Sequence, residues 1–305
     1  MVVGGITMIV FALWECYAPL KEPLLPVHLF KHFPWVAACI NLGIGASIYY
    51  SMAIIWPQIV GGIYANTTTM YAGYLNCIPG AMIVVGMVLG GLLAEPIGRT
   101  NFQVIVAFAA GGALIAACAC VTLDNKSTMI ALLSIGIFFI GWNESVCLSC
   151  AGIELLDQQE IGTAVGAAGS IRSAVSSVAN AVYLSVLANR LGITIPNEVP
   201  PAVINAGLPA ESVPKFIAGF TTGSFANITG LTPEIQAIGT KAYQTASAHA
   251  YSTVFYSTMA FTGIGIVLAF FNPNVDSKMT GDIAVTLHRT DADNMQNEKV
   301  ENVSV

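Results

Sequence analysis

The chain has 305 residues, of which 55% are apolar and only 9% are charged, and its formal net charge is −6. Soluble globular proteins carry about 25% charged residues, and a soluble chain this poor in charge would expose apolar surface and aggregate. A bilayer removes this problem, so the composition predicts a membrane protein, while the acidic balance excludes a nucleic-acid partner, which requires a basic face.

Membrane-spanning helices need roughly 20 mostly apolar residues. The segments that meet this length cover residues 1–18, 33–60, 70–94, 102–122, 128–150, 163–189 and 248–271. They predict an all-α integral membrane protein with about seven transmembrane helices. The first segment has no charged region ahead of it and no cleavage site after it, so it does not resemble a signal peptide. A chain that opens inside the bilayer suggests a missing upstream part, although a short native amino terminus would look the same.

The three longest regions outside these spans have distinct features. Residues 19–32 form a loop, and residues 190–247 are predicted to form a long external loop because they contain several prolines: Pro196, Pro200, Pro201, Pro209 and Pro214. Within it, Thr232-Pro233-Glu234 is typical of a helix start and predicts a short surface helix at about 233–246. The tail, residues 272–305, is polar and predicted to be cytoplasmic and largely disordered.

Two signals give the orientation. Lysines and arginines slightly favour the loops after the first and third spans and the tail, which marks that side as cytoplasmic. Possible N-glycosylation sequons at Asn66, Asn125 and Asn227 all fall in loops on the other side. Both signals predict an external start and a cytoplasmic carboxy terminus.

Ionisable residues inside spans are few, so each is a functional candidate. Glu144 follows Asn143 in the fifth predicted span, and Arg172 lies in the sixth. Both are roughly 10–14 Å from the cytoplasmic side at 1.5 Å per residue, so their opposite charges can pair. One interpretation is a substrate or proton site that faces an aqueous cavity, and the other is a structural ion pair that fixes two helices.

Arg172 belongs to a polar stripe. Residues at spacings of three or four share one helix face, and this stripe comprises Gly169, Arg172, Ser176, Asn180 and Tyr183. Such a stripe faces either a water-filled cavity or a neighbouring helix. Asn41 and Asn76 are further candidates for a cavity, because moving an amide out of water costs free energy unless the amide is hydrogen-bonded. Trp56 and Tyr71 are better explained as an interfacial aromatic belt.

Motifs for catalysis or metal binding are missing from the sequence. Cys147 and Cys150 form a CxxC pair, but nothing nearby supplies further thiolate or imidazole ligands, so no metal site is predicted. No Walker loop, HExxH or GxSxG occurs. We therefore expect neither an enzyme nor a bound cofactor.

A family resemblance begins at the end of the third span. The stretch Gly91-Leu92-Leu93-Ala94-Glu95-Pro96-Ile97-Gly98-Arg99 resembles the loop motif GxLaDrxGRR of the major facilitator superfamily. Gly91, Gly98 and Arg99 match, and Glu95 stands where the pattern has Asp. Pro96 and Thr100 replace basic residues of the pattern, which weakens the charge network that the resemblance implies for gating.

Other stretches resemble the fungal trichothecene efflux pump family within that superfamily. They are Glu22-Pro23-Leu24-Leu25-Pro26, Gly141-Trp142-Asn143-Glu144, Asp157 to Ala164, Gly169 to Ser173, Gly230-Leu231-Thr232-Pro233 and Phe271 to Asp276. The resemblance implies proton-driven export of small organic compounds, such as toxins or drugs of the mycotoxin type, from a fungal cell. It implies that residues 33–271 are the six-helix carboxy-terminal half, that residues 1–18 are the last helix before a cytoplasmic central loop, 19–32, and that the amino-terminal half is missing.

Two alternatives remain open. The chain alone is a truncated membrane fragment without transport if both halves are needed to enclose a substrate. A seven-span receptor fits the span count, but the DRY-like and NPxxY-like motifs of such receptors are missing. The sequence predicts a multi-pass protein of the plasma membrane, with the vacuolar membrane as the alternative.

Overall fold

The computed structural model describes residues 2–17, 27–64, 69–154, 161–226 and 228–279. Six helices in these ranges are long and apolar enough to cross a membrane. They are α2 (Phe33–Gly62), α3 (Thr69–Ile97), α4 (Thr100–Ala117, continued by the 3₁₀ turn η2, Cys118–Cys120), α5 (Lys126–Ile153), α6 (Ile161–Asn205) and α8 (Pro233–Ala269). Shorter elements are α1 (Val2–Tyr17), α7 (Val213–Thr222) and the 3₁₀ turns η1 (Val27–Lys31), η4 (Ala210–Ser212) and η5 (Asp276–Lys278). The protein is an all-α membrane protein, as predicted.

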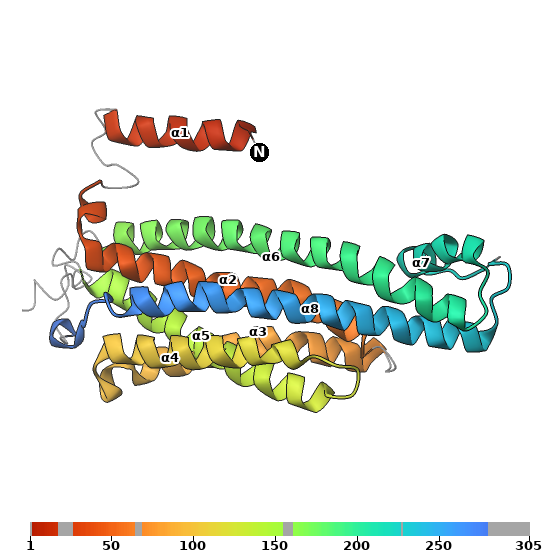
Figure 1. Ribbon diagram of the computed structural model, residues 1–305. Helices are drawn as coiled ribbons and strands as arrows, with labels where there is room; N and C mark the ends of the chain where they lie inside the picture. Colours follow the sequence, from red (N-terminus) through yellow and green to blue (C-terminus); the bar gives the residue numbers. More distant parts are fainter. Residues whose placement is uncertain (1, 18–26, 65–68, 155–160, 227, 280–305) are drawn as a thin grey trace, which may run out of the picture.

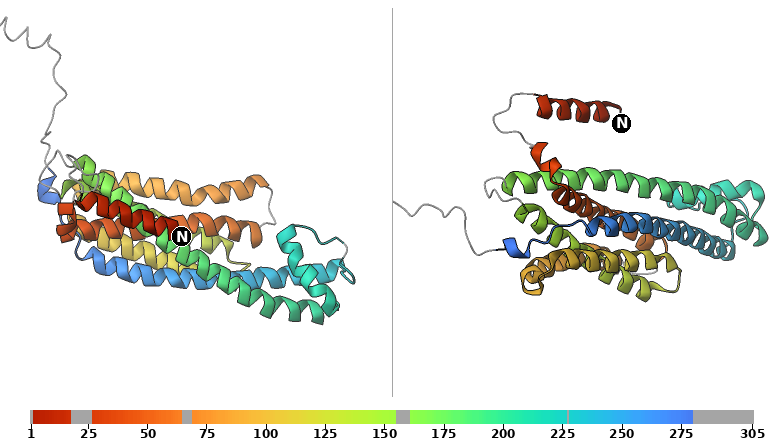
Figure 2. Two further views of the ribbon diagram at one scale, coloured as in Figure 1. Left: turned by 90° about the horizontal axis from the view of Figure 1, so that it is seen from above. Right: turned by 60° about the vertical axis from the view of Figure 1, so that its left-hand side comes forward.

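Helix α1 is separate from the six long helices. It has 16 residues, and Figure 1 and the right-hand view of Figure 2 show it apart from the bundle of the six long helices. Its side chains are largely exposed, including Val3 at 78% and Tyr17 at 82%. The predicted helix at residues 1–18 is therefore present, and its assignment to a missing half stays a prediction. The predicted disordered tail lies outside the described residues from position 280 onward.

Local chemistry fixes where the long helices begin. Thr232 caps α8 because its Oγ1 accepts a hydrogen bond from the N–H of Ile235 at 3.2 Å, and Pro233 follows as the first helical residue. The predicted helix start at this position is confirmed. Helix α4 begins after Gly98 and Arg99, which have φ angles of 67° and 51° and turn the chain sharply.

The six long helices pack closely because glycines remove side chains at their crossings. Helix α5 packs against α3 and α4, and α6 packs against α2 and α8. A Cβ atom on Gly90 of α3 would lie 2.8 Å from the Cα of Trp142 in α5. Such backbone contact between helices is the usual basis of packing in membranes, where the lipid provides no hydrophobic driving force.

The predicted external loop at residues 190–247 is largely helical. Helix α6 continues to Asn205, and the predicted short helix at 233–246 is one piece with the span that follows it. At 1.5 Å per residue, α6 is about 68 Å long and exceeds the roughly 30 Å hydrocarbon core. The prolines in α6 were misleading, because Pro196 and Pro201 are exposed and the helix continues through both.

We call the part beyond the bundle the outer extension, comprising residues 190–205, α7 and residues 233–246. Figure 1 and Figure 2 show it projecting past the ends of α2 to α5. It has its own core, in which Val203 and Phe216 are fully buried, and Phe220 stacks on Tyr243 with centroids 3.9 Å apart. This core stabilises the helices of the outer extension, which the sequence analysis predicted as a loop because of its prolines.

The opposite end of the bundle, which we call the inner end, carries the α3–α4 loop, the end of α5 and the segment after α8. Residues 272–279, which we call the inner strap, run across it. Thr100 donates from Oγ1 to Asn274 Oδ1 at 3.0 Å and accepts from the N–H of Val275 at 3.1 Å. Lys278 Nζ pairs with Glu154 Oε2 at the end of α5 at 3.0 Å. The strap therefore connects the ends of three helices.

Candidate functional site

Glu144 of α5 and Arg172 of α6 form an ion pair in the inner part of the bundle. Arg172 Nη2 and Nε donate to the same oxygen, Glu144 Oε1, at 2.7 and 3.0 Å. Glu144 is 1% exposed and Arg172 is 25% exposed. Tyr50 of α2 is the third member, because its hydroxyl accepts from Arg172 Nη1 at 3.1 Å and its ring lies 5.4 Å from the guanidinium carbon. The pairing that the sequence suggested is present.

Several buried polar atoms near this pair have no hydrogen-bond partner among the described residues. They include the second carboxylate oxygen of Glu144, the amide nitrogen of Asn143 and both amide atoms of Asn41. Asn41 and Asn143 are 0% exposed. Buried polar groups normally find partners, so unpartnered ones mark a place where water, a proton or a ligand can bind.

Two glycines of α2 allow the three helices to meet here. A Cβ on Gly43 would lie 2.7 Å from the Cβ of Val175 in α6. One on Gly45 would lie 2.9 Å from the amide nitrogen of Asn143 in α5. Any larger residue would push α6 or Asn143 away, so these positions determine how closely the charged residues approach α2.

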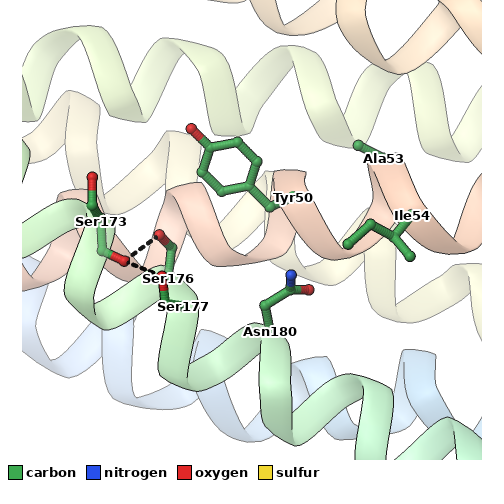
Figure 3. A pocket seen from close by; sticks show the side chains of 7 residues that line it. All are labelled: Tyr50, Ala53, Ile54, Ser173, Ser176, Ser177 and Asn180. Atoms are coloured by element: carbon green, nitrogen blue, oxygen red, sulfur yellow. Dashed lines mark hydrogen bonds between the residues drawn. The ribbon is translucent and has the colours of Figure 1, made fainter. Parts of the chain in front are cut away.

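An open groove of about 370 Å³ lies beside the ion pair between α2 and α6. Figure 3 shows its lining, which comprises Tyr50, Ala53 and Ile54 from α2 and Ser173, Ser176, Ser177 and Asn180 from α6. Asn180 is held in place by Ser51, whose Oγ donates to its Oδ1 at 3.2 Å. The walls thus combine hydroxyl and amide groups with small apolar side chains, and Tyr50 belongs both to the groove and to the ion pair.

The predicted polar stripe divides in the structure. Ser176 and Asn180 line the groove. Tyr183 does not, because it is fully buried and its ring packs against Phe261 of α8 at 4.9 Å. Gly169 has no atom within 4 Å of where a Cβ would stand. The other amide candidate, Asn76, is exposed on α3 and is not among the residues of the groove.

Sequence reasoning missed part of this site. It did not single out Tyr50, Ser173 or Ser177 as candidates. The available signal was helical spacing, because Ser173 and Ser177 are four residues apart and flank Ser176 on α6. The contact of Tyr50 with Arg172, which is 122 positions away, cannot be predicted from the local sequence.

The residues of the loop motif have different environments. Gly91 lies against α5, where a Cβ would be 3.0 Å from Ser145 Oγ. Glu95 is exposed. The backbone carbonyls of Ala94 and Gly98 accept from Gln103 Nε2 at 2.9 and 2.8 Å. Gln103, which the sequence did not highlight, thereby stabilises the loop.

Only one of the three possible glycosylation sites lies in the described residues. Asn125 is the residue before α5, and its side chain accepts from the N–H of Thr122 at 2.9 Å and donates to the carbonyl of Cys120 at 2.5 Å. Its amide is therefore engaged in the turn that starts the helix. Asn66 and Asn227 lie outside the described residues. In the ranges that the structure covers, no group of three or more metal-ligating side chains occurs.

Comparison with known proteins identifies the family. The sequence profile of the fungal trichothecene efflux pump family matches residues 1–303. The chain belongs to this family. It is 31% identical over 293 residues to the MFS-type transporter prx5 of Penicillium rubens, covering 92% of this chain and 52% of that protein. It is 24% identical to the trichothecene efflux pumps TRI12 of Fusarium sporotrichioides, over 93% of this chain and 48% of the pump, and of Trichoderma arundinaceum, over 100% and 53%.

Membership of this family confirms the predicted family relationship, and the six long apolar helices agree with a multi-pass membrane protein. It favours the transporter interpretation over a seven-span receptor. The chain spans about half the length of the curated relatives that it matches.

Proposed function

We propose that the chain forms the carboxy-terminal half of a proton-coupled exporter of small organic compounds, and that the groove between α2 and α6 is one wall of its substrate pathway. The observation that carries this proposal is the Glu144–Arg172 pair, which lies beside the groove and shares Tyr50 with it. Charged groups inside a membrane bundle are expensive and usually belong to transport pathways. The relatives named as trichothecene efflux pumps support export of toxins of that type.

The groove favours an uncharged, oxygen-rich molecule with an apolar body. Its hydroxyl and amide groups can donate to or accept from ether, ester or hydroxyl oxygens, while Ala53 and Ile54 contact apolar surface. The charges of Glu144 and Arg172 neutralise each other, so the groove offers no single strong charge for an ionic substrate.

The same pair supports the proposal of proton coupling. The free oxygen of Glu144 has no partner among the described residues and is the atom that a proton would bind. Protonation removes the negative charge of the pair, so Arg172 is released toward Tyr50 and the groove. A pair that opens on protonation links proton binding to the shape of the substrate wall.

Efflux from cells tests this proposal. Yeast expressing this chain joined to the amino-terminal half of the Penicillium rubens relative would be loaded with a radiolabelled trichothecene. Efflux is normalised to the amount of protein at the cell surface, and we expect Arg172→Ala and Glu144→Gln to abolish this normalised efflux. Arg190→Ala is the matched control, because Arg190 lies on the same helix but in the outer extension, beyond the ion pair and the groove. Normal efflux by both pair variants would refute the proposed role.

A second experiment separates a working half from a non-transporting fragment. The 305-residue chain alone is reconstituted into proteoliposomes with an imposed proton gradient, and trichothecene flux is followed. Because such transporters enclose the substrate between two halves, we expect flux only when the amino-terminal half is added. Sustained flux by the chain alone would contradict this expectation.

We further propose the plasma membrane as the location of the protein, with the vacuolar membrane as the alternative. Fluorescence microscopy of a tagged protein decides between them.

A further inference from the structure

The inner strap holds the start of α4 through one carboxylate. Asp276 accepts hydrogen bonds from the backbone N–H of Arg99 and, at 3.1 Å, from that of Thr100. These residues are the last before α4 and its first, so the carboxylate sits at the positive end of the helix dipole. Asp276 comes from a segment that follows α8, more than 170 residues later in the chain.

The backbone that receives this carboxylate is strained. Arg99 is the one non-glycine residue with a positive φ in the part of the chain that the structure describes, at 51°, and it follows Gly98 at 67°. Left-handed conformations are costly for side chains other than glycine and persist only where other contacts enforce them. Here the conformation directs successive N–H groups toward Asp276, which is the kind of concave site that binds an anion.

Glu95, the acid of the loop motif, makes no such contact. It is exposed, and its carboxylate has no ion pair or hydrogen bond with any of the residues described. The acid that engages the start of α4 is therefore Asp276 of the inner strap, which lies outside the motif. Two neighbouring contacts hold the strap in place: Lys278 pairs with Glu154, and the amide of Asn272 donates to Cys147 Sγ at 3.4 Å.

We propose that Asp276 is the positioning residue of the inner end: its carboxylate, and not that of Glu95, fixes the start of α4 and keeps the inner strap closed over α5. The assignment rests on the proposed transport function only for its effect on turnover. With the strap closed, Cys147 and Cys150 are 0% exposed, and Cys150 Sγ donates to the carbonyl of Pro273 at 3.7 Å. Those two thiols therefore report whether the strap is closed.

Thiol modification of the 305-residue chain in native membranes provides the test. Membranes are treated with N-ethylmaleimide, and the labelled fraction of each cysteine is followed by peptide mass spectrometry. We expect Asp276→Asn to speed modification of Cys147 and Cys150 roughly 10- to 100-fold, because a charge-assisted hydrogen bond is lost. Glu95→Gln, the matched control, should leave both rates unchanged.

A conservative variant separates charge from shape. Asp276→Glu keeps the negative charge but is one methylene longer, whereas Asn keeps the shape and loses the charge. The proposal requires Cys147 and Cys150 to be modified more slowly in Asp276→Glu than in Asp276→Asn. The reverse order would overturn it. Buried Cys118, at the outer end of α4, is the internal control. An equal increase in the modification rates of Cys118 and Cys150 would indicate a general loosening of the fold and would also reject the proposal.

Turnover supplies a separate readout. In the joined protein used for efflux, Asp276→Asn should lower the maximal rate while leaving KM unchanged, because the strap lies at the inner end and not in the groove. The two proposals can fail separately. If neither the wild type nor any variant transports, but Asp276→Asn still speeds the modification of Cys150, the proposed transport function fails and the role of Asp276 stands.

Discussion

Arg172 on α6 and Glu144 on α5 are joined by two hydrogen bonds to a single carboxylate oxygen, which leaves the other oxygen of Glu144 without a partner among the described residues. A structural ion pair would be expected to use both oxygens, since a bidentate arrangement is the most stable one for arginine and a carboxylate. The observed geometry has one bonded oxygen and one available oxygen. The unpartnered oxygen is the one to which the proposed function assigns the proton.

Breaking this pair from one side should strongly destabilise the protein. Arg172→Ala leaves the carboxylate of Glu144 buried without its counter-ion, and losing one partner of a buried pair costs about 3–5 kcal/mol. We expect a lower midpoint of thermal unfolding in detergent. The double variant Glu144→Gln with Arg172→Ala should recover part of this loss, because no unpaired charge remains. An equal or larger loss in the double variant would contradict the ion-pair explanation.

Tyr50 should tune transport without controlling folding. Tyr50→Phe removes the hydroxyl that accepts from Arg172 and keeps the ring that lines the groove. Loss of a single hydrogen bond of about 0.5–1.5 kcal/mol corresponds to a roughly 2- to 12-fold fall in efflux rate. The neighbouring Tyr49→Phe is the control, since Tyr49 does not line the groove. Equal effects of the two substitutions on the efflux rate would argue against a specific contact of Tyr50 with Arg172.

The α3–α5 crossing should tolerate no added methyl group. A Cβ on Gly86 would collide with the backbone of Phe138, whereas one on Gly80 of the same helix meets nothing within 4 Å. Overpacking costs typically 1–3 kcal/mol or more, so Gly86→Ala should lower the unfolding midpoint and the yield of folded protein. Gly80→Ala should be neutral or slightly stabilising, because alanine favours a helix over glycine. Size-exclusion profiles and thermal unfolding of the two variants provide the comparison.

Acidity should release the inner strap only well below physiological pH. Burial acts to raise the pKa of Asp276, but the N–H groups of Arg99 and Thr100 outweigh it, so this pKa lies below its ordinary value of 3.8. An aspartate in the unfolded chain has a pKa of about 3.9, and a lower pKa in the folded protein means that the ionised carboxylate stabilises the folded state above this pH. The stabilisation is lost as the pH falls through the lower pKa of the folded protein.

Hydrogen exchange at the start of α4 measures this dependence. After correction for intrinsic rates, protection should be constant between pH 5 and 8 and should fall below about pH 4, where the wild type approaches Asp276→Asn. A fall in protection between pH 5 and 7 would mean that a different group controls the strap.

Local sequence predicted the membrane helices because a spanning segment needs only length and low polarity, and both are visible in any window of residues. Thr232-Pro233 likewise predicted the start of α8, since a cap acts over three residues. The outer extension was not predicted. Its helices depend on contacts of Phe216 and Val203, which come from different segments, and these contacts override the proline content of α6.

The candidate site shows the same division between local and long-range information. Sequence alone determined that Glu144 and Arg172 are charged residues at similar depth in two apolar spans, because burying a charge in lipid is costly enough to make each conspicuous. Only the tertiary structure decided that Tyr50 completes the pair and that Asp276, rather than Glu95, holds the start of α4. Those contacts join residues more than 120 positions apart. Helix packing, and not any local preference of the chain, brings them together.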